Sequence, residues 1–156
     1  EIVTYLGQIS GLELTKNQQK EFLRLMDAVN DLENIGDVIE TNLVDLGRRR
    51  IKKGVSISDA TQGVLNGFHE VVTRAVDTAI RSVAEDNLED ARSVADMKKE
   101  ITAIANSAAV HESKRLVVNE PNRIEAYTIE MDITEKLQRI YYFARRMART
   151  VIKGAT

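Results

Sequence analysis

The chain has 156 residues, of which 43% are hydrophobic and 29% charged, and its formal net charge is -2. It is long and apolar enough to bury one hydrophobic core, and its nearly balanced charge gives no reason to expect a nucleic-acid partner. The lack of cysteine excludes disulfides, cysteine zinc sites and thiol catalysis, and no apolar run approaches the ~20 residues of a membrane-spanning helix, so we expect none here.

The first residues carry no targeting signal. The chain opens with Glu1 rather than methionine, and no basic region, apolar core or cleavage site follows. We therefore expect a fragment of a longer protein, whose remainder holds a membrane segment or a second domain. The apolar segment 2–9 is then interpreted as the stub of an additional helix.

A long first helix is predicted between Thr15 and Gly54. Thr15 and Gln18 have the spacing of a capping box, in which a hydroxyl and an amide satisfy backbone donors at the helix start. The basic run at 48–53 suits the negative end of the helix dipole. Apolar residues at steps of three and four predict one buried stripe. That stripe is Phe22, Leu25, Val29, Leu32, Gly36, Ile39, Leu43 and Leu46.

Three further helices follow in the same way. The second ends near residue 85, the third runs to about residue 118, and the fourth opens at Pro121, where a missing N–H is harmless. The N-cap candidates are Ser58 or Asp59 for the second helix and Asp86 or Asn87 for the third. The predicted stripes are Leu65, Phe68, Val72, Ala75, Ala79 and Val83; Val94, Met97, Ile101, Ile104, Ala108 and His111; and Ile133, Leu137, Ile140, Ala144, Met147 and Val151.

No segment alternates apolar and polar residues at period two, so the sequence predicts no sheet. Long helices joined by short turns must pack antiparallel. The expected fold class is therefore all-α, an antiparallel bundle of long helices.

The segment 30–37 carries the best candidate for chemistry. On a helix, Glu33 and Asp37 lie one turn apart, and their mutual repulsion makes a cation a natural third party. Gly36 costs about 1 kcal/mol of helix propensity relative to alanine, which suggests close approach by another helix or a ligand. The alternative is that both acids are solvated and Gly36 is a packing contact.

This segment, Asp-Leu-Glu-x-Ile-Gly-Asp at 31–37, resembles the signature of the PhoU family, helical phosphate-regulation proteins built from two three-helix repeats. More closely, these residues together with Tyr5-Leu6, Leu14 and Gln18 look like the PhoU-like domain at the C-terminus of bacterial sodium/phosphate cotransporters. The segment 111–116, His-Glu-Ser-Lys-Arg-Leu, fits that group as well.

The resemblance implies a single PhoU-like domain over 1–156. Residues 1–54 would be the end of a first repeat, and 57–153 a second three-helix repeat. A missing first helix would leave an apolar face on the Phe22 to Leu46 stripe, to be covered by a partner chain or by the rest of the parent. A homodimer is therefore expected.

The resemblance also implies a divalent or iron-type metal ion at Glu33 and Asp37, which match the acidic positions of the family motif. The equivalent positions of the second repeat are Gln138 and Tyr142. A neutral amide and a phenol that titrates near 10 do not supply the charge that hard cations require. We therefore expect at most one weak metal site.

The function expected from the resemblance is a non-enzymatic domain at the cytoplasmic face of the inner or plasma membrane. It would regulate or assemble a sodium-dependent phosphate transporter whose membrane portion belongs to the same parent chain. Two alternatives stay open: a free-standing phosphate-uptake regulator, and a metal-dependent hydrolase or oxidase using the acidic helix. No Glu-x-x-His pair, nucleophile elbow or phosphate-binding glycine loop accompanies the acids.

The remaining charged and histidine residues have ordinary interpretations. The basic run at 48–53 is a helix C-terminus or a contact with anionic headgroups. The arginines in 139–149 allow the same two interpretations, and salt bridges to acidic helices as a third. His69 and His111 are expected at the core or its boundary with local hydrogen-bond partners.

Overall fold

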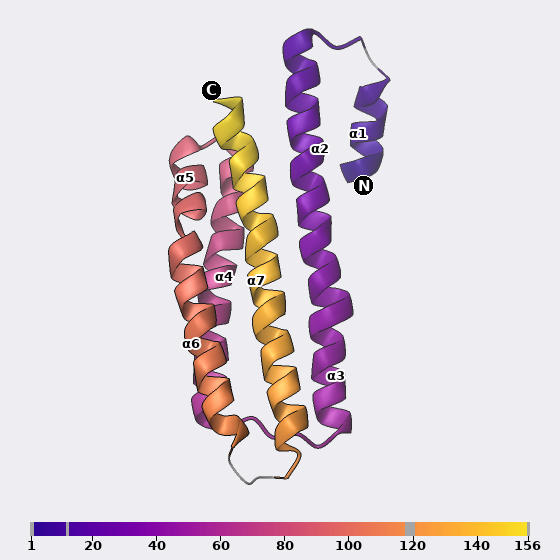
Figure 1. The fold of residues 1–156 in the computed structure, drawn as a ribbon. Helices are drawn as coiled ribbons and strands as arrows, with labels where there is room; N and C mark the ends of the chain where they lie inside the picture. The colour runs from indigo at the N-terminus through magenta and orange to yellow at the C-terminus, as the bar shows by residue number, and fades with distance from the viewer. Residues whose placement is uncertain (1, 12, 118–120, 156) are drawn as a thin grey trace.

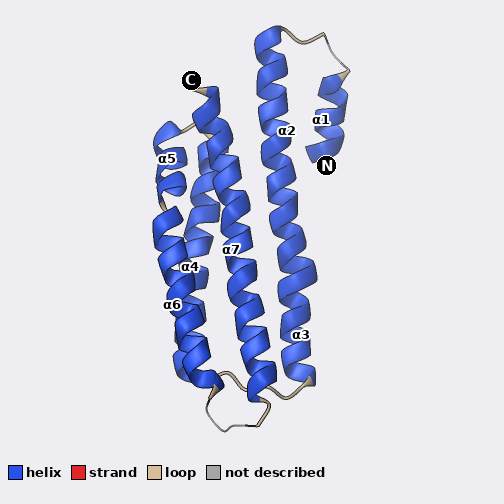
Figure 2. Ribbon diagram, viewed as in Figure 1, coloured by secondary structure: helices blue, strands red, loops and turns tan. Residues whose placement is uncertain are grey.

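A computed structural model describes residues 2–11, 13–117 and 121–155 of the chain, and the chain folds into an all-α bundle (Figures 1 and 2). Within these ranges there is no β-strand, which confirms the predicted fold class. The helices are α1 (Ile2–Ser10), α2 (Lys16–Asp37), the π-helical segment η1 (Val38–Leu43), α3 (Val44–Lys52), α4 (Asp59–Ala84), α5 (Leu88–Asp96), α6 (Lys98–Leu116) and α7 (Arg123–Gly154).

The helix α7 is the centre of the molecule. It packs against α4 and against α5 and α6, which follow each other end to end, and these helices form one bundle with it (Figure 1). On another side α7 packs against the continuous rod made of α2, η1 and α3. Within the described residues, this rod makes no comparable packing contact with α4, α5 or α6. An ion pair of 2.6 Å between Arg24 and Asp86 also ties the upper end of α2 to the α4–α5 connection. The rod is therefore attached to the bundle mainly through α7.

The hydrophobic core follows the stripes predicted for the last three helices. Phe68, Ala75 and Ala79 of α4 are fully buried, as are Val94 of α5 and Ala144 of α7. Only the ends and edges of these stripes are half-buried, at Val83, Met97, Ile104, His111 and Ile133. Steps of three and four thus identified the inward face of each of these helices correctly.

Local capping explains where the helices begin and end. The predicted capping box is present, with the Thr15 hydroxyl accepting from the Gln18 N–H and the Gln18 amide oxygen accepting from the Thr15 N–H. Ser58 caps α4 and Asn87 caps α5 through bonds from side-chain oxygen to backbone N–H. At the end of α3, Gly54 adopts φ +61°, a left-handed conformation that glycine tolerates without strain.

Two predicted helices differ from the structure, one by an interruption and one at its start. The third is interrupted at Met97, where α5 stops and α6 begins. The fourth begins at Arg123 rather than Pro121, because Asn122 takes a left-handed conformation, with φ 57°, directly before it. Pro121 lies in the turn. Val118, the expected end of the third helix, lies outside the described residues.

The predicted stripe of the first long helix is right only in part: Leu32 and Leu43 are half-buried and pack against the core, while most of the fully buried positions lie on a neighbouring face. The residues of α2 and η1 that are buried are Ala28, Asp31, Ile35 and Val38. Gly36 and Ile39, two members of the predicted stripe, are exposed. Leu46 is the one predicted position in this stripe that is buried within the described residues. The helix therefore turns a neighbouring face toward α7.

The π-helical segment explains part of this rotation. A π-helix bonds residue i to i+5 and so advances less around the axis per residue than an α-helix does. Six residues, Val38–Leu43, take this form. A stripe drawn at α-helical spacing cannot stay on one face across such a segment. Leu46 thus returns to the core side although Ile39 does not.

A pair of isoleucines four residues apart tests the orientation of α2. Ile35 is 4% exposed and Ile39 is 46% exposed. We expect Ile35→Ala to lower the free energy of unfolding by roughly 2–5 kcal/mol, as core truncations do. Ile39→Ala should cost less than about 1 kcal/mol, since it removes little buried surface. Urea denaturation of both variants measures the difference, and a larger loss for Ile39→Ala would contradict this orientation.

Candidate functional site

The acidic pair predicted from the sequence lies on the surface of α2. Glu33 and Asp37 are both exposed and one helical turn apart, as expected for positions i and i+4. Neither forms an ion pair with another residue of the part of the chain that the structure describes. Gly36 is exposed between them, and a Cβ added there would meet no atom within 4 Å. None of the described helices therefore uses the close approach that Gly36 permits.

The donor set of this pair is small for a metal ion. Among the described residues there is no group of three or more His, Cys, Asp or Glu side chains that could hold a metal. Two carboxylates fit the chemistry of a hard cation, which prefers oxygen ligands but usually takes six or more of them. The remaining ligands would have to come from water or from another chain. Metal binding at Glu33 and Asp37 stays a prediction.

The equivalent positions on α7 carry no carboxylate. Gln138 and Tyr142 are both exposed, and Tyr142 lies beside the guanidinium of Arg146, which is 5.8 Å from the centre of its ring. This arrangement is a cation–π contact at the surface. The positions that the resemblance would make a second copy of the motif therefore hold an arginine-flanked aromatic side chain instead of a pair of acids.

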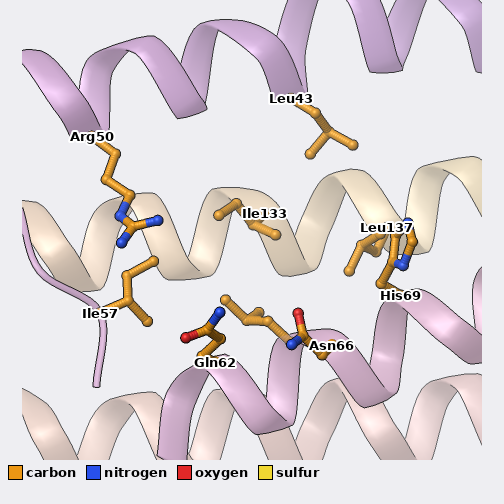
Figure 3. A pocket seen from close by; sticks show the side chains of 9 residues that line it. Leu43, Arg50, Ile57, Gln62, Asn66, His69, Ile133 and Leu137 are labelled. Carbon is orange, nitrogen blue, oxygen red and sulfur yellow. The ribbon is translucent and has the colours of Figure 1, made fainter. Parts of the chain in front are cut away.

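A groove lies between the η1–α3 segment and α4, with α7 as its floor (Figure 3). Its cavity volume is about 260 Å³. Figure 3 shows Leu43 and Arg50 on one wall, Ile133 and Leu137 of α7 between the walls, and His69 on the opposite side. The complete lining is Leu43, Arg50, Ile57, Gln62, Leu65, Asn66, His69, Ile133 and Leu137. An apolar floor with a polar rim suits a side chain or helix edge better than a charged substrate.

Sequence reasoning missed a buried polar cluster near the end of the bundle where α6 and α7 connect. Glu112 of α6 and Glu130 of α7 are both 0% exposed, and Arg123 is 6% exposed. The Arg123 guanidinium donates to Glu130, with Nη2 2.7 Å from Oε2. The Thr134 hydroxyl donates to Glu112 Oε1 over 3.0 Å. We call these four residues the buried polar cluster.

Part of this cluster was detectable in the sequence. Arg123 and Glu130 precede Leu137 at intervals of seven residues and therefore continue its stripe toward the start of α7. Seven-residue spacing keeps side chains on one helix face. Charged residues on that face must be buried and paired, because the stripe faces the core. No comparable signal in the sequence identified Glu112, whose neighbour His111 was the expected stripe residue.

A third buried carboxyl, that of Asp31, lies between α2 and α7. Asp31 is 1% exposed, and its Oδ1 lies 3.3 Å from Arg146 Nε as an ion pair without hydrogen-bond geometry. Burial raises the pKa of Asp31, the positive charge of Arg146 opposes that rise, and Asp27 adds to it. Of the three interpretations for the arginines of α7, Arg146 thus fits the salt bridge to an acidic helix.

The other predicted side chains find local partners. Arg49, in the basic run, donates to Glu125 of α7 over 2.8 Å, which lowers the pKa of that carboxyl. His111 Nε2 lies 3.0 Å from the Thr61 hydroxyl. These contacts fit the interpretation of both groups as structural elements of the bundle.

Comparison of the chain with protein-family models, with curated proteins and with solved structures finds no match in any of the three. Among the described helices, none is both long and apolar enough to cross a membrane.

The Arg123–Glu130 pair gives a test of the buried polar cluster. Arg123→Ala leaves Glu130 buried without its partner, so we expect the free energy of unfolding to fall by roughly 3–5 kcal/mol. The matched control is Arg139→Ala on the exposed side of α7, where the guanidinium lies 5.9 Å from the Phe143 ring. That loss should stay near or below about 1 kcal/mol. Urea denaturation at neutral pH measures both, and equal losses would contradict the burial of the pair.

The predicted metal site is tested by direct metal analysis. Protein purified without chelator should retain a divalent or iron-type ion, and the Glu33→Gln/Asp37→Asn variant should lose it, because the variant keeps the shape and removes both charges. Inductively coupled plasma mass spectrometry on both proteins gives the ratio of metal to protein. Equal, near-zero metal in the two proteins would remove the cation from the function proposed below.

Proposed function

We propose that this chain is a non-enzymatic regulatory or assembly domain of a sodium-dependent phosphate transporter, acting at the cytoplasmic face of the membrane. The resemblance of residues 31–37 to the cotransporter-associated PhoU-like motif suggests this role. The observation that carries it is the exposure of Glu33, Gly36 and Asp37 of that motif on a helix held mainly from one side. The rod of α2, η1 and α3 packs on α7, while Glu33 and Asp37 point away from the residues buried there.

The outer surface of α2 favours contact with another helix. We define this surface as Glu33, Gly36, Asp37 and Glu40, all of which are exposed. Gly36 costs the helix about 1 kcal/mol relative to alanine, and no described residue comes within 4 Å of a Cβ added there. Close packing of a second helix against Gly36 would explain why a glycine, and not a larger residue, stands at this helical position.

Charge indicates what kind of segment packs there. Glu33, Asp37 and Glu40 make the outer surface of α2 acidic over two turns. Cytoplasmic loops of membrane proteins carry an excess of lysine and arginine. The membrane portion of the same parent chain therefore presents the complementary charge at the side where this domain would lie. Complementary potentials fix the orientation of such a contact and suppress wrong partners.

A cation at Glu33 and Asp37 supplies a way to regulate this contact. Binding of a divalent ion neutralises the two carboxylates and weakens their attraction for a basic loop. An ion that binds the free surface better than the docked one shifts the equilibrium between the two arrangements. The chemistry stays with the transporter, because no nucleophile or general base accompanies the acidic pair, and the domain changes only the population of states.

Glycine substitutions on two helices test the proposal. In the isolated chain, Gly36→Ala should raise the free energy of unfolding by about 1 kcal/mol, since the added Cβ meets no atom. In the parent transporter, Gly36→Leu should place a bulky side chain where the partner helix packs. Sodium-dependent uptake of radiolabelled phosphate should then change to the level of a parent that lacks this domain.

The matched control is Gly63→Leu on α4, another exposed helical glycine with no atom within 4 Å of an added Cβ. Uptake should be unchanged in that variant. If Gly36→Leu also leaves uptake at the wild-type level, the outer surface of α2 is not the regulatory contact. If Gly36→Leu instead dissociates a homodimer of the isolated chain in sedimentation experiments, the occupant is a second copy and the proposed transporter contact is wrong.

A further inference from the structure

Glu112 is a buried carboxyl group whose hydrogen bonding is incomplete. It is 0% exposed on α6. Its Oε1 accepts from the Thr134 hydroxyl over 3.0 Å, while Oε2 is buried and has no hydrogen-bond partner. An ionised carboxylate needs partners for both oxygens when it is removed from water. This position is therefore costly for the charged form and tolerable for the neutral one.

The charges around Glu112 do not compensate for a second negative charge. From α7, Arg123 and Glu130 face it, and both terminal nitrogens of Arg123 are already engaged by the Glu130 carboxylate, at 3.4 and 2.7 Å. From α4, the neighbouring contact is the uncharged Thr61, which bonds His111. On α6 itself, the nearby titratable side chains are His111 and Arg115, one residue before and three residues after Glu112. Two buried carboxyls thus share the one arginine that α7 provides.

We propose that Glu112 is protonated in the packed bundle and serves as a proton-sensitive latch between α6 and α7. Ionisation as the pH rises places a second negative charge beside Glu130 and leaves Oε2 without a donor. The hydrogen bond from Thr134 favours the ionised form but does not compensate for these two costs, so the end of the bundle where α6 and α7 connect loosens. A bound metal ion in place of the proton is disfavoured by the Arg123 guanidinium.

The electrostatic environment agrees with this assignment. Burial raises the pKa of Glu112, the hydrogen bond from Thr134 opposes the rise, Glu130 adds to it, and Arg123 opposes it. The folded chain therefore holds this proton at pH values where the unfolded chain, with an ordinary value of 4.5, has released it. The stability that this one proton contributes is fully present below pH 4.5, the ordinary pKa of the unfolded chain. It is lost as the pH rises through the higher pKa of Glu112 in the folded chain.

The latch goes beyond the proposed transporter function and does not depend on it. Thr134 follows Ile133, which lies on the floor of the groove between η1–α3 and α4 (Figure 3). Loosening of α6 from α7 at this level therefore shifts a residue that lines the groove. A change in pH would in this way alter the shape of the groove between η1–α3 and α4.

The decisive variant is Glu112→Gln, which keeps the shape, removes the charge and supplies an N–H donor. In an Asp31→Asn background, which removes the other buried carboxyl with a raised pKa, the folding equilibrium constant with Glu112 should fall as pH rises, by up to about tenfold per pH unit between the unfolded and folded pKa values. The same measurement on Glu112→Gln should be nearly flat. Urea denaturation at intervals from about pH 5 to pH 8 gives both curves.

The matched control is Glu70→Gln on the exposed surface of α4, which should leave the pH dependence as it is. A Glu112→Gln profile that superimposes on that of Glu112 would overturn the latch. Should Glu112→Gln not fold, carbon-13 NMR titration of Glu112 in the unchanged chain decides. A midpoint above that of Glu70 supports the latch, and a midpoint at or below it overturns the proposal.

Amide hydrogen exchange adds a readout that a purely structural glutamate would not move. Faster exchange at high pH, corrected for the intrinsic rate, should be confined to the α6–α7 end of the bundle. The opposite end of the bundle, where α4 and α5 connect, is remote from Glu112 and its exchange rates should not change with pH. Uniform loss of protection along all helices would contradict a local latch.

Discussion

Burial of α7 between the α4–α6 helices and the α2–α3 rod is the constraint on which the structure depends. Its core residues meet α4 and the α5–α6 pair on one side and the α2–α3 rod on another. Because apolar surface removed from water stabilises in proportion to its area, the helix with most neighbours contributes most to the fold. The other helices are held together chiefly by their contacts with α7. Damage to α7 should therefore disturb every part of the molecule.

The same constraint explains why α2 is open on its outer side. The described helices that pack on α2 are α7 and, to a smaller extent, α1, so α2 buries mainly the face toward α7 and leaves the rest to solvent or to a partner. On α2 the buried face contains Ala28 and Ile35, while the motif residues Glu33 and Asp37 are exposed. The described helices thus leave this part of α2 uncovered, and this part carries Glu33 and Asp37. The proposed transporter contact follows from this coincidence of exposure, charge and a helical glycine.

Polar groups inside the bundle make its packing sensitive to charge. The Glu130 carboxylate is paired with Arg123, although Arg123 Nε is buried without a hydrogen bond, and Asp31 and Glu112 each keep a buried oxygen without a hydrogen bond. A satisfied network rigidifies a core, and an incomplete one is where a change in protonation acts first. The two incomplete carboxyls lie at different helix contacts, α2 with α7 and α6 with α7. Protonation therefore bears on both sides of the central helix.

The sequence by itself determined the all-α class, the capping of α2, α4 and α5, and the inward faces of α4 to α7, because caps and periodicity act within a few residues. It did not determine which face of α2 meets α7, since periodicity gives the angle between residues and not the position of a neighbour. The π-helical segment η1, at Val38–Leu43, and the burial of Glu112 were decided by tertiary structure. Both depend on groups far apart in the chain, whose contacts exist only after the helices pack.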